Sequence, residues 1–194
     1  DVRGFQTIVE SYMQHMVSST TTALTVSGLE KLDKRQAYVF VSNHRDIAMD
    51  PAFMNWVLWH NGMDTVRIAI GDNLLSKPFV SDLMRLNKSF LVQRGETAPK
   101  KIYAALKQLS AYIHFSVMEE KSSIWIAQRE GRAKDGVDRT EEAIIKMFAM
   151  SKPKEQALAD FVRELNIVPV SISYEWDPCD LAKARELQQK AALG

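Results

Sequence analysis

Short apolar runs that alternate with helical patterns are the feature that most restricts the fold of this chain. The runs are four to seven residues long, and they are AYVFV (37–41), VRIAI (66–70), SFLV (89–92), SIWIA (123–127) and IVPVSIS (167–173). Continuous apolar runs of this length, separated by helices, are typical of strands buried in a parallel sheet. We therefore predict an α/β fold over residues 1–194: one domain with a mostly parallel central sheet flanked by helices.

The segments between these runs predict the helices. Residues 5–20 carry one apolar stripe at helical spacing, formed by Phe5, Ile8, Val9, Tyr12, Met13 and Met16. Further helices are predicted at 52–60, 76–85, 97–119, 140–150 and 154–165, and after Asp180. The β-branched stretch Thr22–Val26 predicts one additional short strand before Ser27 and Gly28.

Composition excludes several classes of protein. The 194 residues carry a formal net charge of +1 with no Arg-rich block, so we expect no nucleic-acid partner. The single cysteine, Cys179, excludes an internal disulfide. No apolar run is long enough for a membrane-spanning helix, and no signal peptide is visible. The sequence starts at Asp1 and stops within a helical pattern, so we expect truncated termini whose missing flanks could hold an anchor.

Polar residues follow three of the predicted strands. Asn43-His44, Gln93-Arg94 and Gln128-Arg129-Glu130 each come just past an apolar run. Ligands of open α/β sheets bind beyond the carboxyl ends of the strands. We therefore expect these three segments to converge on one site.

The stretch VSNHRDIAMD, residues 41–50, contains the strongest candidate for a catalytic group. A histidine can act as a general base near neutral pH, and a carboxylate beside it fixes its tautomer and stabilises the imidazolium. Asp46 and Asp50 are both candidates for that carboxylate. The structural alternatives are a partly buried, satisfied His44 and an Asp50 that caps the following helix.

Cationic residues follow two other strands. Arg94 could hold a phosphate or carboxylate in bidentate fashion, although an arginine after a strand is more often a surface residue. The loop 128–136 offers Arg129, Arg132 and Lys134 to an anionic substrate, and Gly131 allows a close backbone approach. A solvated turn of mixed charge is the alternative for this loop.

Two other motifs are excluded. His44-Arg45-Asp46 is similar to the catalytic loop of protein kinases, but Pro51 stands where that pattern requires an asparagine. The four histidines are scattered, without an HExxH motif or a cysteine pair, so no metal site is predicted.

Taken in order, these segments resemble the glycerophospholipid acyltransferases, that is, the lysophosphatidate and glycerol-3-phosphate acyltransferases. Their Asn-His-x4-Asp block is similar to Asn43-His44 followed by Asp50. Their Phe-Ile-x-Arg block is similar to residues 87–94, which follow Lys77-Pro78-Phe79. Their Phe-Pro-Glu-Gly-Thr-Arg-Ser block is similar to residues 127–132. Their Val-Pro-Val strand is similar to 167–170, so the resemblance spans about 25–175.

The sequence departs from the family pattern at two places. Met49 occupies the family position of the aspartate, and Asp50 lies one residue further on. We expect Asp50 to reach His44 from the first helical turn, with Asp46 as the alternative. The third block is one residue short, and only Glu130 and Gly131 match it without a shift, while Arg132 matches with one.

The resemblance implies a glycerol-3-phosphate acyltransferase-like fold and an enzyme that transfers an acyl group. A fatty acyl group would move from an acyl thioester, of CoA or acyl carrier protein, to a hydroxyl of a glycerol-phosphate lipid such as 1-acyl-glycerol 3-phosphate. His44 would be the general base and Asp50 its partner. The residues implied in substrate binding are Asn43, Arg45, Asp46, Arg94, Glu130, Gly131 and Arg132.

The resemblance also implies the partners and the location. No metal or bound cofactor is implied, since the thioester is a co-substrate. The lipid acceptor implies peripheral contact with the cytoplasmic face of a membrane, in bacteria the inner membrane. The stripe in 5–20 and the segment 53–59 could meet the lipid, although core packing is the commoner role of such stripes. The competing hypotheses are an inactive acyltransferase-like module that binds lipid or membrane, and a thioester hydrolase.

Overall fold

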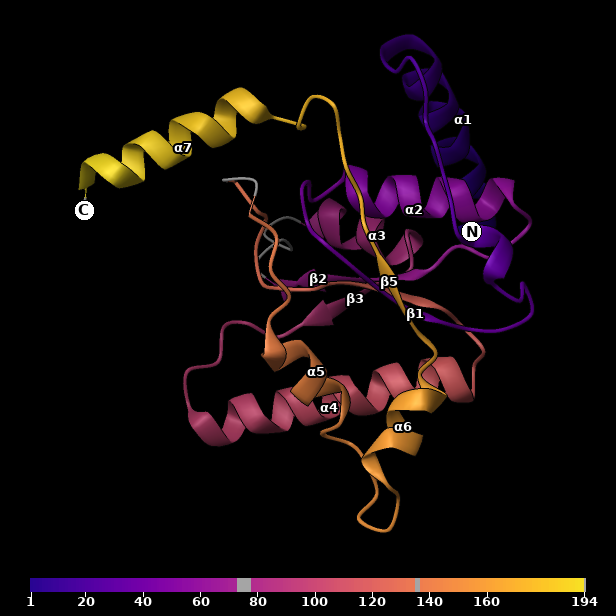
Figure 1. The fold of residues 1–194 in the computed structure, drawn as a ribbon, viewed down its shortest axis with the longest axis vertical. Coiled ribbons are helices and arrows are strands. Elements are labelled where there is room, and N and C mark those ends of the chain that lie inside the picture. The colour runs from indigo at the N-terminus through magenta and orange to yellow at the C-terminus, as the bar shows by residue number, and fades with distance from the viewer. Residues whose placement is uncertain (73–77, 135–136, 194) are drawn as a thin grey trace.

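A computed structural model describes residues 1–72, 78–134 and 137–193. In this part of the chain, five strands form one sheet in the order β3-β2-β4-β1-β5, and every pair is parallel (Figure 1). The strands are β1 (Val39–Ser42), β2 (Arg67–Gly71), β3 (Ser89–Val92), β4 (Ile124–Ala127) and β5 (Ile167–Val170). The predicted α/β fold with a parallel central sheet is confirmed.

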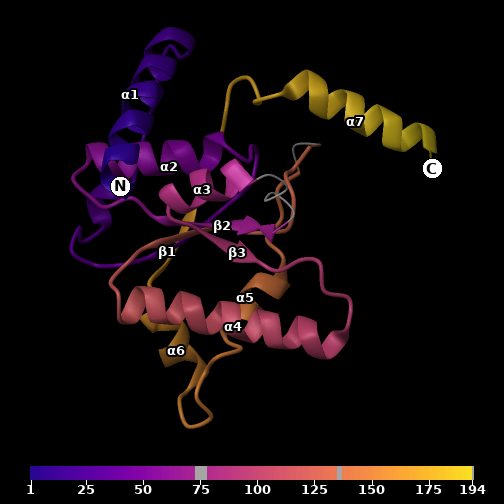
Figure 2. The same cartoon turned by 180° about the vertical axis from the view of Figure 1, so that it is seen from behind.

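Helices cover both faces of this sheet. One layer contains α1 (Val2–Thr20), α2 (Met49–His60) and α3 (Pro78–Leu86), and the other contains α4 (Pro99–Met118), α5 (Glu142–Phe148) and α6 (Leu158–Glu164) (Figures 1 and 2). A short 3-10 helix spans Leu29–Lys31, and α7 (Asp180–Leu193) extends away from the layered body in both views. All predicted helices are present, with bounds shifted by a few residues. Ser76 and Lys77, at the predicted start of α3, lie outside the described residues.

The alternation of side chains along each strand explains why both faces need helices. Val39 and Val41 point to the face where they join a core cluster with Ile113 of α4. Phe40, between them, joins a second cluster with Leu58 of α2 on the opposite face. Because neither face of the strand meets water, the sequence shows continuous apolar runs instead of an alternating pattern.

The register brings the carboxyl ends of the central strands to one level. Ser42, the last residue of β1, pairs with Ala127 of β4 and with Val170 of β5. At the other side of the sheet, Gly71 of β2 pairs with Val92 of β3. The segments that follow these strands therefore emerge at the same edge of the sheet.

The predicted strand at Thr22–Val26 is wrong. These residues contain no strand, and the segment lies mostly exposed between α1 and the 3-10 helix. β-Branched residues favour a strand when they pack on a half-buried pleated surface, and this segment has no such surface.

The two segments proposed for lipid contact, 5–20 and 53–59, together have some of their apolar side chains in the core and others on the surface. Met13 of α1 and Leu58 of α2 are buried, whereas Ile8 and Tyr12 of α1 are exposed. Among the described residues, no helix has both the length and the apolar character needed to cross a bilayer.

Candidate active site

The loop between β1 and α2 positions the histidine. One carboxylate oxygen of Asp46 accepts hydrogen bonds from the backbone N–H groups of Ala48 and Met49, both at 2.9 Å. These bonds hold the turn that leads into α2, whose N-cap residue is Ala48, and Pro51 suits the first helical turn that follows. Asp50 lies in that first turn.

Asp50 is the carboxylate that contacts His44. Asp50 Oδ2 lies 2.9 Å from His44 Nδ1, and the side chains are 0% and 12% exposed, respectively. The backbone N–H groups of Arg45 and Asp46 donate to the same oxygen, at 2.7 and 3.0 Å. His44 and Asp50 are separated by one residue more than in the family pattern, and the loop accommodates this residue by wrapping around the carboxylate.

This arrangement selects one imidazole tautomer. Because Asp50 only accepts, a neutral His44 places its proton on Nδ1 and leaves the Nε2 lone pair available. Nε2 makes no hydrogen bond to any described residue, and the imidazole packs edge-on to Trp125 of β4, with ring centroids 5.8 Å apart. A histidine held in this way can accept a proton from a bound hydroxyl.

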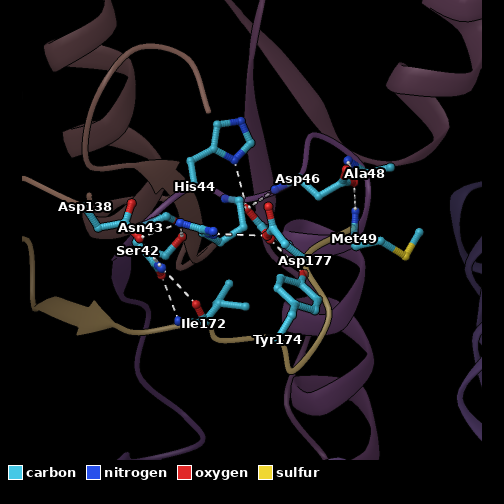
Figure 3. A network of polar contacts seen from close by, with 12 residues as sticks. Ser42, Asn43, His44, Asp46, Ala48, Met49, Asp138, Ile172, Tyr174 and Asp177 are labelled. Carbon is cyan, nitrogen blue, oxygen red and sulfur yellow. Dashed lines mark hydrogen bonds and ion pairs between the residues drawn. The ribbon is translucent and has the colours of Figure 1, made fainter. Parts of the chain in front are cut away.

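Tyr174 completes the surroundings of Asp50. Its hydroxyl donates to Asp50 Oδ1 at 2.7 Å, and in Figure 3 its ring lies on the opposite side of the network from His44. Burial, together with the nearby charge of Asp50, raises the pKa of Tyr174 well above its usual range, so the hydroxyl remains a donor. Sequence reasoning missed Tyr174, because nothing in the sequence links it to a residue 124 positions away.

Asn43 joins the ends of two strands. Its amide oxygen accepts from the backbone N–H of Ile172 at 2.7 Å, and its amide nitrogen donates to Ile172 O at 2.8 Å and to Asp138 Oδ2 at 3.1 Å. Asn43, Arg45 and Asp46 were all predicted to bind substrate. The contacts that the structure shows for their polar groups are internal, and they hold the histidine loop.

Arg45 belongs to a cluster with Asp177 and Lys183. Arg45 Nε donates to Asp177 at 3.1 Å, while Lys183 donates to Asp177 at 2.7 Å and to Arg45 O at 2.6 Å. Burial alone would raise the pKa of Asp177, but the hydrogen bonds from Lys183 and Arg45 outweigh it and lower that pKa. The cluster connects the start of α7 to the histidine loop. Asp177 and Lys183, which follow β5, had no recognisable signal in the sequence.

Arg94 and Glu130 meet at the other part of the same edge. Arg94 Nη1 lies 3.5 Å from Glu130 Oε1, with side chains 37% and 69% exposed. The backbone N–H of Arg94 donates to Asp72, which follows β2. Arg132 is half-buried and forms no ion pair with a described residue. We call Arg94, Glu130, Gly131 and Arg132 the rim.

The loop after β4 connects this rim to the histidine. Gly131 has φ +74°, and no atom lies within 4 Å of the position a Cβ would take. Two residues further on, Ala133 N donates to His44 O at 2.8 Å. Arg129 Nε is buried without a hydrogen-bond partner in the described part of the chain. Asp135 and Gly136, at the end of the predicted loop, lie outside the described residues.

The site residues do not include a metal-binding group. Within residues 1–72, 78–134 and 137–193, no set of three or more His, Cys, Asp or Glu side chains is placed to hold a metal ion. What the arrangement offers is a buried histidine–carboxylate pair, with cationic groups along the same edge of the sheet.

Comparison with known proteins gives three findings. No curated protein matches this sequence. Among solved structures, the 1-acyl-sn-glycerophosphate (LPA) acyltransferase PlsC from Thermotoga maritima is similar, with a TM-score of 0.53 and 12% sequence identity over 96% of this chain and 79% of that one. At that identity the likeness shows the fold. The sequence model of the Acyltransferase family matches residues 23–173, which hold His44, Asp50 and the rim. The chain therefore belongs to the acyltransferase family.

Proposed function

We propose that this protein transfers a fatty acyl group from an acyl thioester, of CoA or acyl carrier protein, to a hydroxyl of a glycerol-phosphate lipid such as 1-acyl-glycerol 3-phosphate. The observation that carries the proposal is the 2.9 Å contact between His44 Nδ1 and the buried Asp50, inside the region that matches the acyltransferase family. The PlsC neighbour is named for acylation of a glycerophosphate, and this supports the same class of acceptor here.

In the proposed reaction, His44 Nε2 removes the proton of the acceptor hydroxyl as its oxygen attacks the thioester carbonyl. Asp50 holds the imidazole in position and stabilises the imidazolium that forms. When the tetrahedral intermediate collapses, the C–S bond breaks and the sulfur takes the proton from His44. The products are an ester and a free thiol, and no covalent acyl-enzyme is required.

The rim is proposed to bind the phosphate of the acceptor. β3, which precedes Arg94, and β1, which precedes His44, are three strand spacings apart, about 14 Å. The Arg94 side chain contacts Glu130 after β4, so it extends toward the strand next to β1. Arg132, and the buried Nε of Arg129, add donors for an anion near the middle of this edge. Gly131 leaves room for a ligand close to the backbone.

We propose no metal or bound cofactor for this reaction. The location proposed from the lipid acceptor is peripheral, at the cytoplasmic face of a membrane, in bacteria the inner membrane. Ile8 and Tyr12, exposed on α1, are the side chains proposed for lipid contact.

The test is release of free thiol from palmitoyl-CoA, with and without lysophosphatidate or glycerol 3-phosphate. We expect release that depends on an acceptor and that falls by about 10²–10⁴-fold in His44→Ala. His114→Ala is the matched control, because His114 also pairs with a carboxylate, Glu164 at 3.1 Å, but lies on α4. It should keep full activity.

Other outcomes would select the competing hypotheses. Thiol release without any acceptor would identify a thioester hydrolase. No release from palmitoyl-CoA would lead to the same assay with an acyl carrier protein donor. No turnover with either donor, combined with binding of phospholipid vesicles, would identify an inactive lipid-binding module.

A further inference from the structure

The region that matches the acyltransferase family ends at residue 173, and the next residue contacts the proposed catalytic pair. We propose that Tyr174 is a positioning residue: its hydroxyl fixes the second oxygen of Asp50, and through Asp50 it sets the orientation and the basicity of His44. The inference about catalysis rests on the proposed function.

The hydrogen bonds of Asp50 show why one hydroxyl matters. Oδ2 accepts from His44 and from two backbone N–H groups, so that oxygen remains bonded if any single donor is lost. Oδ1 accepts only from Tyr174 among the described residues. Because Asp50 is 0% exposed, water has no access to replace that donor, and Oδ1 would be left as a buried acceptor without a partner among the described residues.

The chain holds Tyr174 in place from both sides. Two residues before it, Ile172 exchanges two hydrogen bonds with the Asn43 amide. Three residues after it, Asp177 bonds Arg45 and Lys183. The ring itself packs near Phe53 of α2, with centroids 6.0 Å apart. The hydroxyl therefore meets Asp50 at a fixed position, which is what a positioning role requires.

The electrostatic effect of removing the hydroxyl has a definite sign. A donor on Oδ1 draws negative charge away from the side of Asp50 that faces the imidazole. Without it, Asp50 would attract the imidazolium more strongly, and His44 would keep its proton to higher pH.

The other charged groups around the pair have partners of their own. Arg45 bonds Asp177 and Asp138, Lys183 bonds Asp177, and Asp46 accepts from the backbone N–H groups at the start of α2. None of these contacts uses the Tyr174 hydroxyl, so they should stay unchanged when it is removed.

The test compares wild type with Tyr174→Phe, which removes only the hydroxyl. We expect the acidic limb of the kcat/KM profile, and the midpoint of the NMR titration of the His44 imidazole, to move to higher pH than in wild type. We also expect kcat to fall by about tenfold while KM for the acceptor stays within about twofold, because one hydrogen bond to a charged group is lost.

Tyr38→Phe is the matched control. Tyr38 is also buried, and its hydroxyl bonds the backbone of Asp33, but it precedes β1 at the opposite edge of the sheet. This variant should leave the imidazole titration unchanged. A lower kcat in Tyr174→Phe with an unchanged imidazole midpoint would show a merely structural role and overturn the proposal.

Two further outcomes separate the proposals. If wild type transfers no acyl group but Tyr174→Phe still moves the imidazole midpoint, the proposed function fails and the control of His44 by Tyr174 stands. If Tyr174→Phe does not stay folded, the hydroxyl proton is measured by NMR in wild type. A slowly exchanging Tyr174 resonance would support the proposal, and rapid exchange with water would overturn it.

Discussion

At the β1 part of the sheet edge, the charged side chains around the histidine are bonded inside the protein. Asp50 is fully buried and accepts four hydrogen bonds from described residues, and Lys183, which donates to Arg45 O in the histidine loop, is 3% exposed. At the β3 part of the same edge, the one ion pair that Arg94 forms with a described residue is 3.5 Å long, and its carboxylate, Glu130, is 69% exposed. The same edge thus carries one region held by many short contacts and another that is open to solvent.

The difference matches two different tasks. A general base works only when its lone pair is fixed within a fraction of an ångström, so its partners must not reorganise during the reaction. A group that binds a phosphate must instead exchange water and a weak internal partner for the ligand. An exposed ion pair suits this, because breaking it costs little.

The largest expected effect comes from Asp50→Asn. The carboxamide oxygen would keep the place of Oδ2, because it can accept there from the backbone N–H groups of Arg45 and Asp46 and from His44 Nδ1, but the negative charge that stabilises the imidazolium would be lost. We expect kcat/KM to fall by about 10³-fold or more, with KM little changed. Initial rates over a range of acceptor concentrations measure both constants.

Asp46→Asn is the control for that experiment. Asp46 is also buried and lies in the same loop, but one of its carboxylate oxygens accepts from the backbone N–H groups of Ala48 and Met49, and an asparagine offers the same acceptor oxygen. Activity should therefore remain within a few fold of wild type. Equal losses in Asp46→Asn and Asp50→Asn would contradict the pairing of His44 with Asp50 alone.

A smaller effect is expected at Asp177, which bonds Arg45 of the histidine loop and Lys183 of α7. Asp177→Asn leaves the buried Lys183 without its carboxylate, and we expect the free energy of unfolding at pH 7 to fall by about 3 kcal/mol. The folded-state pKa of Asp177 is lowered from 3.8, so its contribution is fully present above that pH and is lost as the pH falls below it. The difference between wild type and variant, measured by urea unfolding, should therefore shrink as the pH falls below 3.8.

A double-variant cycle sharpens this result. Lys183→Met alone should also destabilise, because Asp177 then remains partly buried with only Arg45 as a partner. The double variant Asp177→Asn/Lys183→Met should lose less than the sum of the two single variants. Strict additivity would show that the 2.7 Å contact contributes no coupling energy.

The sequence predicted some features of these two regions well and others poorly, and the reasons are physical. The strands at 37–41 and 123–127 were predictable because burial on both faces requires continuous apolar residues. The choice between Asp46 and Asp50 was open, because it depends on how a loop of five residues bends. It is settled by the backbone donors of Arg45 and Asp46, and backbone groups leave no trace in a sequence.

Contacts between distant segments were the least predictable. Tyr174 and Lys183 approach the histidine loop only because β5 pairs with β1, and no local pattern encodes that pairing. The rim was anticipated as a cluster because parallel strands end at a shared edge. The strand predicted at Thr22–Val26 failed for the opposite reason: its local preference was correct for a strand, but none of the strands in the described part of the chain pairs with it.

The smallest effect is expected at the rim. Arg94→Ala should raise KM for lysophosphatidate by about tenfold and leave kcat almost unchanged, because it removes one charged contact to a phosphate whose own bonds do not change in the reaction. Arg94→Lys keeps the charge but not the bidentate geometry, so its KM should lie between those of wild type and Arg94→Ala. Glu130→Ala should change KM by less than about threefold, since an exposed ion pair contributes little.

An acceptor without a phosphate tests whether the rim recognises that group. With a monoacylglycerol as acceptor, Arg94→Ala and wild type should have equal kcat/KM, because the missing guanidinium then has nothing to bind. His44→Ala should remain inactive with both acceptors. An equal loss in Arg94→Ala with both acceptors would instead mean that Arg94 supports the fold through its neighbours Asp72 and Glu130. The contrast between a fixed catalytic pair and an open binding rim would then not hold.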